Sequence, residues 1–137
     1  MKPALLAAVV TCLLVPGCSG NSRLDPDLRC AGHEIPGVDQ VVVEIQTSLD
    51  RRVDMYGQSI FNGRLRTDQE KTQSGRELAF SPDACAALAV PDHGHYTVEA
   101  DTGGYEMCFW MGEQGFAFNG GTQYVVLQLN HTIMCHG

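Results

Sequence analysis

Hydrophobic and polar residues alternate along much of the chain, which is the pattern of strands that bury one face. The alternation is clearest in residues 41–46 and 96–101, where successive side chains would point to opposite faces of a sheet. Less regular runs predict further strands at residues 53–56, 60–67, 105–111, 115–118 and 125–135, with breaks at Gly57 and Gly63 and a short apolar alternation at residues 78–80. About seven short strands are therefore expected.

Turn-forming residues separate these runs. The pairs Gly103-Gly104 and Gly120-Gly121 indicate turns, and the polar residues 68–75 indicate an exposed loop. Ser81-Pro82-Asp83 matches a helix start, with an N-cap serine, a proline suited to the first helical position and an acid favoured by the helix dipole. We therefore predict a short helix over residues 84–90, ended by the proline that follows. The expected fold is all-β: a small, mainly antiparallel β-sandwich with one short helix, stapled by two disulfides.

The first eighteen residues have the features of an export signal. Lys2 precedes an apolar run over residues 4–15, and the composition turns polar after Cys18. Twelve apolar residues rise about 18 Å as a helix, whereas the hydrocarbon core of a bilayer is roughly 30 Å thick, so this segment is too short to span comfortably. A positive start, a short apolar middle and a small residue before the break match a cleaved secretory signal.

The end of this signal resembles the lipobox of bacterial lipoproteins. The matching run is Val15-Pro16-Gly17-Cys18, in which Pro16 departs from the small or aliphatic residue that is usual there. The resemblance implies that signal peptidase II cuts before Cys18 and that this cysteine carries a diacylglycerol, usually with a third acyl chain such as palmitate in Gram-negative species. Two or more acyl chains make membrane attachment stable. An ordinary signal peptidase that cuts after Gly20 would instead release a secreted protein, such as an inhibitor-like domain.

Removal of residues 1–17 leaves 120 residues, enough for one domain with one core. Residues 18–29 are polar and are expected to form a lipidated flexible tether, and residues 30–137 a single disulfide-bonded β domain. Because Lys2 leaves with the signal, the mature chain has eight basic and sixteen acidic residues and a formal charge near −8. This surface repels phosphates and has no basic run, so no nucleic-acid partner is expected. Solubility is the simplest role of the acidity.

Four cysteines remain after loss of the signal and lipidation of Cys18. An even number in an exported chain predicts two disulfides, and no C-x-x-C pair suggests a zinc ribbon or a redox motif. Three connectivities are open. Because the termini of small domains often lie close together, we favour Cys30 with Cys135, which leaves Cys85 with Cys108.

Residues 90–129 resemble a second family. The run VPDHGHYTVEA over residues 90–100, followed by Gly103-Gly104-Tyr105, is similar to the proline, glycine, tyrosine-x-valine, glycine-tyrosine stretch of carboxypeptidase regulatory-like and Cna-B-type domains. Residues 125–129 resemble their final strand. Two extra residues lengthen the usual proline-glycine turn, and the early half of the chain fits the family pattern poorly. The resemblance implies a prealbumin-like sandwich with a non-enzymatic role in adhesion, spacing or binding.

Histidines are the first candidates for chemistry. On a continuous strand, His93 and His95 would project to the same face and could begin a Zn or Cu site. Pro91 and Gly94 indicate a turn instead, in which both histidines are solvated, so no metal site is assigned. His131 lies on the apolar face of the last run and suits a core or strand-edge position. The remaining histidines, His33 and His136, lie near the chain ends.

The other candidate groups form no catalytic pattern. Ser59 lacks the flanking glycine of a hydrolase elbow, and no cysteine remains to act as a thiolate. Glu99 and Asp101 share a strand face, which suits acid–base work, but an exposed acidic face is the commoner reason for this spacing. Phe109 and Trp110 point to opposite faces, so one of them could lie exposed as a ligand contact unless both faces are covered. No catalytic residue and no cofactor are expected.

These features favour a membrane-anchored, extracytoplasmic lipoprotein that acts as a non-catalytic binding or structural accessory module of the bacterial cell envelope. It would lie on the outer membrane of a Gram-negative cell, or otherwise on the cell membrane, with a protein or polysaccharide of the envelope as the candidate partner. The alternative is a small periplasmic metal-binding or enzymatic protein that uses His93 and His95. Zinc or copper titration of the protein and of its double alanine variant at these positions would separate the two hypotheses.

Overall fold

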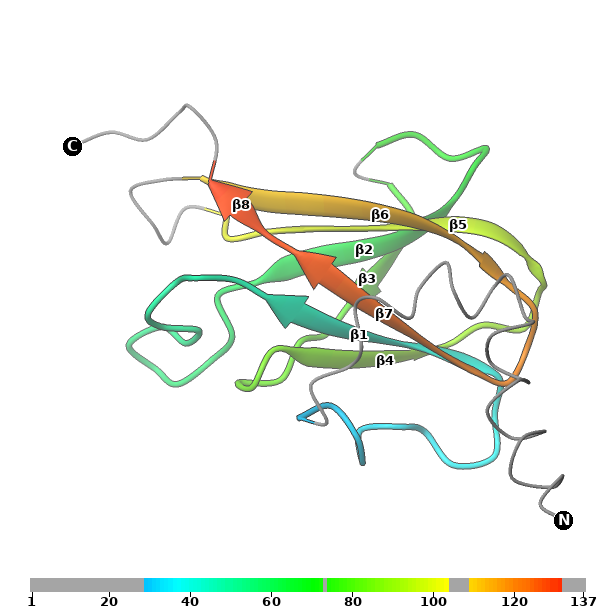
Figure 1. Ribbon diagram of the computed structural model, residues 1–137, viewed down its shortest axis with the longest axis horizontal. Helices are drawn as coiled ribbons and strands as arrows, with labels where there is room; N and C mark the ends of the chain where they lie inside the picture. The colour runs from blue at the N-terminus through cyan, green and yellow to red at the C-terminus, as the bar shows by residue number, and fades with distance from the viewer. Residues whose placement is uncertain (1–28, 73, 104–108, 132–137) are drawn as a thin grey trace, which may run out of the picture.

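The computed structural model describes residues 29–72, 74–103 and 109–131, which fold into two packed β-sheets (Figure 1). One sheet has the strand order β4-β1-β7, and the other has the order β3-β2-β5-β6-β8. The strands are β1 (Gln40–Gln46), β2 (Asn62–Thr67), β3 (Arg76–Leu78), β4 (Cys85–Ala89), β5 (Gly94–Asp101), β6 (Trp110–Phe118), β7 (Thr122–Gln128) and β8 (Asn130–His131). The all-β class and the mainly antiparallel two-sheet arrangement are confirmed, and the described residues contain no helix.

Strand β1 is buried on both of its faces. It lies between β4, with which it pairs antiparallel, and β7, with which it pairs parallel. Val41, Val43 and Ile45 belong to the core between the two sheets, as the alternation predicts. Val42 and Glu44, on the opposite face, are also buried. The outer face of this sheet therefore has a cover of its own.

A leading segment, residues 29–39, supplies this cover. Its Cys30 forms a disulfide with Cys85 at the start of β4, with Cα atoms 5.5 Å apart, and the disulfide packs on the outer face of the sheet. The side-chain amide of Gln40 accepts a hydrogen bond from the Ile35 backbone N–H and donates one to the Ile35 carbonyl, both at 2.7 Å. The segment is thus fastened to the sheet covalently at one end and by hydrogen bonds near the other.

Glu44 is a buried carboxylate beneath this segment. The Arg29 guanidinium lies 3.7 Å from the carboxylate, and the side-chain amide of Gln46 donates a hydrogen bond to it at 3.2 Å. Arg29 also donates to the Ile45 carbonyl at 2.6 Å. A buried carboxylate without such partners would be strongly destabilising, so the chain that precedes β1 contributes polar partners as well as apolar cover.

The disulfide pairing differs from the one that we favoured from the sequence. The pairs Cys30–Cys135 and Cys85–Cys108 are wrong, because Cys30 is joined to Cys85. The physical reason is strand order: β4 lies beside β1, with Cys85 directly opposite Glu44, beneath the leading segment. Cys108 and Cys135 lie outside the described residues.

The predicted helix over residues 84–90 is also wrong, because strand β4 occupies these positions. The Ser81 N–H donates to the Cys85 carbonyl and the Ala84 N–H donates to the Ser81 carbonyl, both at 2.8 Å, so the serine-proline-aspartate sequence closes a turn. Ala84 takes a φ of 66°, in the left-handed region. A short apolar run fits a buried strand as well as a helix, and pairing with β1 decides between them here.

Two breaks that we predicted within strands, at Gly63 and between residues 111 and 115, are absent. Strand β2 continues through Gly63, and β6 extends the predicted strand at residues 115–118 backward as far as Trp110. Residues 53–56 contribute only one isolated bridge to the described structure. At Gly63 the glycine serves close packing, because an added Cβ would lie 2.5 Å from the Phe80 ring.

The two sheets come into close contact at Gly112 of β6. An added Cβ at this position would lie 2.1 Å from the Gln128 carbonyl oxygen and 2.9 Å from Leu129 Cδ2. The first of these atoms belongs to the backbone of the opposite sheet, so it cannot move aside as a flexible side chain can. Protein interiors are close-packed, and a methyl group at this position would have to displace a strand.

We predict that Gly112→Ala destabilises the protein by about 1–3 kcal/mol, the usual cost of overpacking. The free energy of unfolding in urea would measure the effect. Gly115→Ala on the same strand is the matched control, because its added Cβ would meet nothing closer than 3.8 Å. Equal stability of the two variants would contradict a close contact between the sheets at residue 112.

Candidate functional site

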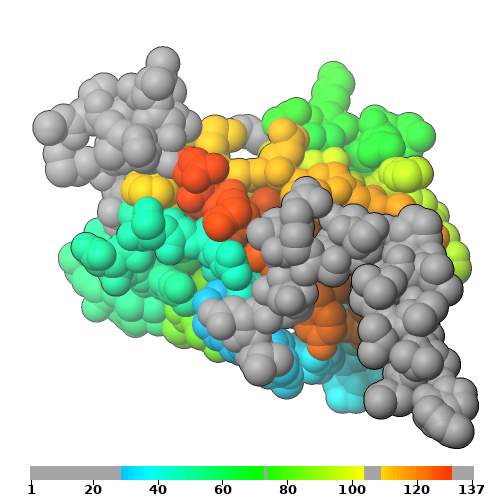
Figure 2. Space-filling view, in the orientation of Figure 1, coloured from blue at the N-terminus to red at the C-terminus, as the bar shows by residue number. Residues whose placement is uncertain are grey.

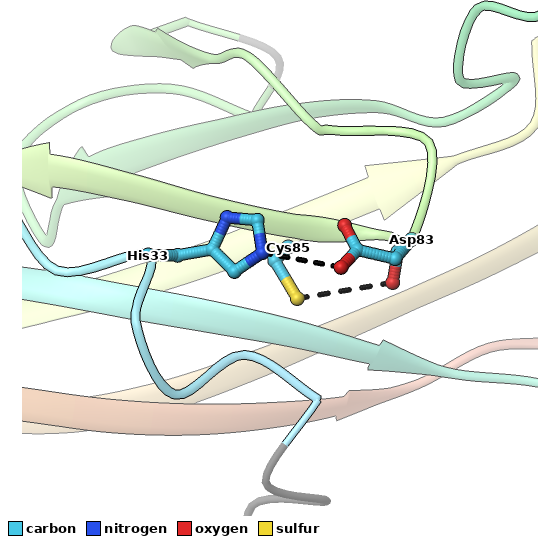
Figure 3. A group of neighbouring side chains, drawn as sticks. All are labelled: His33, Asp83 and Cys85. Atoms are coloured by element: carbon cyan, nitrogen blue, oxygen red, sulfur yellow. Dashed lines mark hydrogen bonds and ion pairs between the residues drawn. The ribbon is translucent and has the colours of Figure 1, made fainter.

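His33 and Asp83 form a hydrogen-bonded pair beside the disulfide (Figure 3). His33 belongs to the leading segment and Asp83 to the turn before β4, and His33 Nε2 lies 3.1 Å from Asp83 Oδ2. The Sγ atom of Cys85 lies 3.8 Å from the Asp83 carbonyl oxygen. Both side chains of the pair are partly exposed. The disulfide thus brings together an imidazole and a carboxylate that are 50 residues apart in the chain.

Ser81 completes a chain of three polar side chains, but in an order that does not suit nucleophilic catalysis. Its hydroxyl donates a hydrogen bond to the Asp83 carboxylate and accepts one from the Cys85 backbone N–H at 3.1 Å. In a catalytic triad the histidine lies between the serine and the carboxylate, where it can take the serine proton. Here the carboxylate lies in the middle, so the arrangement fixes the turn and gives the serine no base.

The Asp83 carboxylate is stabilised in its charged form. The hydrogen bond from Ser81 is the largest cause that lowers the pKa of Asp83, the hydrogen bond from His33 adds to it, and partial burial opposes both. A carboxyl group whose pKa is lower in the folded protein than in the unfolded chain stabilises the fold at neutral pH. This group therefore strengthens the attachment of the leading segment to β4.

His33, Asp83 and Cys85 are also the one group in the described part of the chain whose histidine, cysteine and acidic ligand atoms could hold a metal ion. These atoms lie within 4.8 Å of one another. However, Cys85 Sγ is bonded to Cys30, and only a free thiolate binds metal. The oxidised protein therefore offers two ligands here, fewer than the three or four of protein zinc sites, and we assign no metal to this group.

The structure places His93 and His95 in different surroundings. His93 precedes β5, and its ring packs edge-on against Phe118, with ring centroids 6.1 Å apart. His95 lies in β5 opposite Ala117 and is exposed. Neither histidine belongs to a group of three candidate ligands within the described residues. The backbone of His131 pairs with Trp110, and His136 lies outside the described residues.

Glu99 and Asp101, which share a face of β5, take part in different structural contacts. Arg66 donates to Glu99 at 2.7 Å and to Glu113 at 2.9 Å. The hydrogen bond with Glu99 is the largest cause that raises the pKa of Arg66. Because Glu99 and Glu113 lie directly opposite each other on β5 and β6, Arg66 offsets a repulsion between like charges. Asp101 instead accepts the backbone N–H of Gly103 at 2.8 Å.

The other candidate residues from the sequence also make contacts within the fold where the structure describes them. The Ser59 hydroxyl accepts a hydrogen bond from the Phe61 backbone N–H at 3.2 Å. Phe109 and Trp110 are both half-buried, and Trp110 packs against the core between the sheets. The neighbouring Met111 is 46% exposed. The lipidation candidate Cys18 lies outside the described residues.

The surface of the described residues includes two open depressions near candidate polar side chains. One, of about 630 Å³, lies on the five-stranded sheet, and its lining includes Asn62, Arg64, Glu77 and Asp101. The other, of about 510 Å³, lies at the ends of β1 and β7, and its lining includes Arg29, Gln46, Arg52 and Gln128. Small-molecule sites are usually enclosed and mostly apolar, and neither depression has this character.

An exposed apolar tip on the segment between β1 and β2 was not predicted from the sequence. Met55 and Tyr56 are 85% and 80% exposed, the highest values among the large hydrophobic side chains of the described residues. Their exposure was not expected because residues 53–56 were predicted to form a strand. The signal that could have revealed the tip is Asp54 followed three residues later by Gly57, a pattern typical of a tight turn.

We predict that Asp83→Asn lowers the free energy of unfolding by about 1 kcal/mol at pH 7, because a hydrogen-bonded charge at a partly exposed site is lost. The folded-state pKa lies below the ordinary value of 3.8, so this stabilisation is present above pH 3.8 and is lost as the pH falls through the folded-state pKa. Urea midpoints at pH 7 and pH 3 would measure it, with the exposed Glu77→Gln as control. A deficit of equal size at both pH values would contradict the assigned role.

The chain was compared with protein-family models, curated protein sequences and solved structures, and none of them matches it. Within the described residues, no helix has the length and apolar character needed to cross a bilayer. The function must therefore be inferred from the chain's own residues and their arrangement.

Proposed function

We propose that this protein is a bacterial lipoprotein anchored through Cys18, whose extracytoplasmic β-sandwich is a non-catalytic binding or structural accessory module of the cell envelope. The observation that carries this proposal is the disulfide between Cys30 and Cys85. Disulfides form and persist in the oxidising compartments outside the cytoplasm. Cys30 follows Cys18 by only twelve residues, so the beginning of the domain supports the same export route as the lipobox resemblance.

The contacts of the candidate catalytic groups support a role in binding rather than catalysis. Ser81 donates to Asp83 and not to His33, Glu99 is paired with Arg66, and Cys30 is oxidised. Each group thus stabilises the fold through the atoms that catalysis would need to be free. The exposed apolar tip is the kind of surface that marks a contact site.

The two-sheet architecture is compatible with the resemblance of residues 90–129 to carboxypeptidase regulatory-like and Cna-B-type domains. Under that resemblance the domain serves adhesion, spacing or binding, with a protein or polysaccharide of the envelope as its partner. The location follows the cell type: the outer membrane in a Gram-negative species and the cell membrane otherwise.

We also propose a second disulfide, between Cys108 and Cys135. Of the three connectivities open to the four cysteines, only one contains the pair Cys30–Cys85. The described register of β6 and β8 supports it, because Trp110 lies opposite His131. Cys108 precedes Trp110 by two residues, and Cys135 follows His131 by four.

We predict that the mature chain extracted from membranes begins at Cys18 and carries two or three acyl chains. Intact mass before and after treatment with an alkylating agent would show the lipid and no free thiol. A non-reducing peptide map would join Cys30 to Cys85 and Cys108 to Cys135. The protein would enter the detergent phase on phase partition, because two acyl chains suffice for stable attachment.

Cys18→Ala is the matched control for this experiment, since it removes the lipidated atom and leaves the domain unchanged. It is expected to remain in the aqueous phase or to retain its signal. A wild-type chain that starts after Gly20 and is released without lipid would contradict the anchor. Alkylatable cysteines throughout the domain would contradict the oxidising compartment.

A further inference from the structure

The segment between β1 and β2, residues 47–61, extends beyond the ends of the strands on one side of the sandwich (Figures 1 and 2). Its tip presents Met55 and Tyr56 to solvent, at 85% and 80% exposure. An exposed methionine is common on a protein surface, but two adjacent large apolar side chains at the end of a projecting segment are unusual there.

The tip is held in one conformation by its own hydrogen bonds. Asp54 Oδ1 accepts the backbone N–H groups of Tyr56 at 2.8 Å and Gln58 at 3.0 Å. The Asp54 N–H donates to the Gln58 carbonyl at 2.8 Å, and the Gly57 N–H donates to the Asp54 carbonyl at 3.1 Å. A surface that is already ordered loses little conformational entropy when it binds. The two apolar side chains are thus presented ready for contact.

The base of this segment lies beside the point where the tether joins the domain. Arg29, the first described residue, donates to the Ile45 carbonyl near the end of β1. Arg29 and Arg52 line the same depression. The eleven residue steps from Cys18 to Arg29 span at most about 40 Å when fully extended. A lipid on Cys18 would therefore keep Arg29 within about 40 Å of the bilayer surface.

We infer that the Met55-Tyr56 tip docks on the interface of the bilayer to which Cys18 is anchored, an inference that rests on the proposed lipoprotein. Tyrosine is enriched at membrane interfaces, where its ring is apolar and its hydroxyl remains hydrated. The flexible methionine can enter the acyl boundary beside it. Because the anchor makes this contact intramolecular, a weak interaction suffices.

Lipid-chain quenching of a tryptophan at the tip tests this inference. The lipidated full chain carrying Tyr56→Trp is placed in phosphatidylethanolamine–phosphatidylglycerol vesicles with or without bromine on the upper acyl carbons. Residue 56 is exposed, so an unchanged urea midpoint is expected and verifies the fold. The matched control is Ala117→Trp, at an exposed position near the C-terminal end of β6. The native Trp110 supplies the same background in both variants.

We expect brominated lipid to remove about half or more of the emission that Tyr56→Trp adds to the wild-type signal, and to leave the emission added by Ala117→Trp nearly unchanged. Lipidated protein that stays on the vesicles while the tryptophan introduced at the tip is unquenched would overturn the docked tip alone. Intact mass of the same sample separates this from the other failure, because a chain without lipid overturns the lipoprotein itself.

Discussion

Burial of both faces of β1 is the constraint on which the rest of the structure depends. Its inner face joins the core between the sheets, and its outer face would be open to water without residues 29–39. Those residues are too few to form a core of their own, so they are held by one covalent bond, Cys30–Cys85, and by a few polar contacts. A disulfide closing a loop of this size stabilises a fold by about 2–4 kcal/mol, a large part of the total for a small domain. The fold of the sheet and the compartment in which it forms are thus linked through the same pair of sulfur atoms.

The strands that bury one face were predictable from the sequence, because alternation is a local signal. β5 alternates between core and surface as predicted, and the core-facing positions of β1 were correctly identified. The helix at residues 84–90 was wrong because its apolar run carries no period, and a serine-proline-aspartate sequence suits a turn as well as a cap. Which element forms is decided by β1, more than 40 residues earlier in the chain. The strand break predicted at Gly63 was wrong for a similar reason, because the missing side chain makes room for the Phe80 ring.

The candidate site was harder to predict than the strands, because it depends on contacts between residues far apart in the sequence. Pairing of Cys30 with Cys85 follows from the neighbourhood of β4 and β1, which no spacing in the sequence reveals. His33 was left without a role because its partner Asp83 lies 50 residues away. Met55 and Tyr56 were assigned to a strand, and their exposure follows from a turn that closes on Asp54. In each case the local sequence is compatible with two structures, and tertiary packing chooses one.

Among the described residues, several groups that could carry chemistry make contacts that stabilise the fold. Arg66 bridges two carboxylates on the five-stranded sheet, and Ser81, Asp83 and His33 hold the leading segment to β4. The ordered apolar tip formed by Met55 and Tyr56 is the exposed surface on which the proposed contact depends. The proposed lipoprotein would hold this small domain near the membrane through a short tether.

Hydrogen exchange of the Cys30→Ala/Cys85→Ala double variant, followed residue by residue, tests most directly whether the leading segment maintains the buried outer face of β1. If it does, the amides of residues 29–39 and of β1 lose protection first, while those of β2, β5 and β6 keep most of theirs. Uniform loss of protection across both sheets, or unchanged protection of β1, would contradict the account.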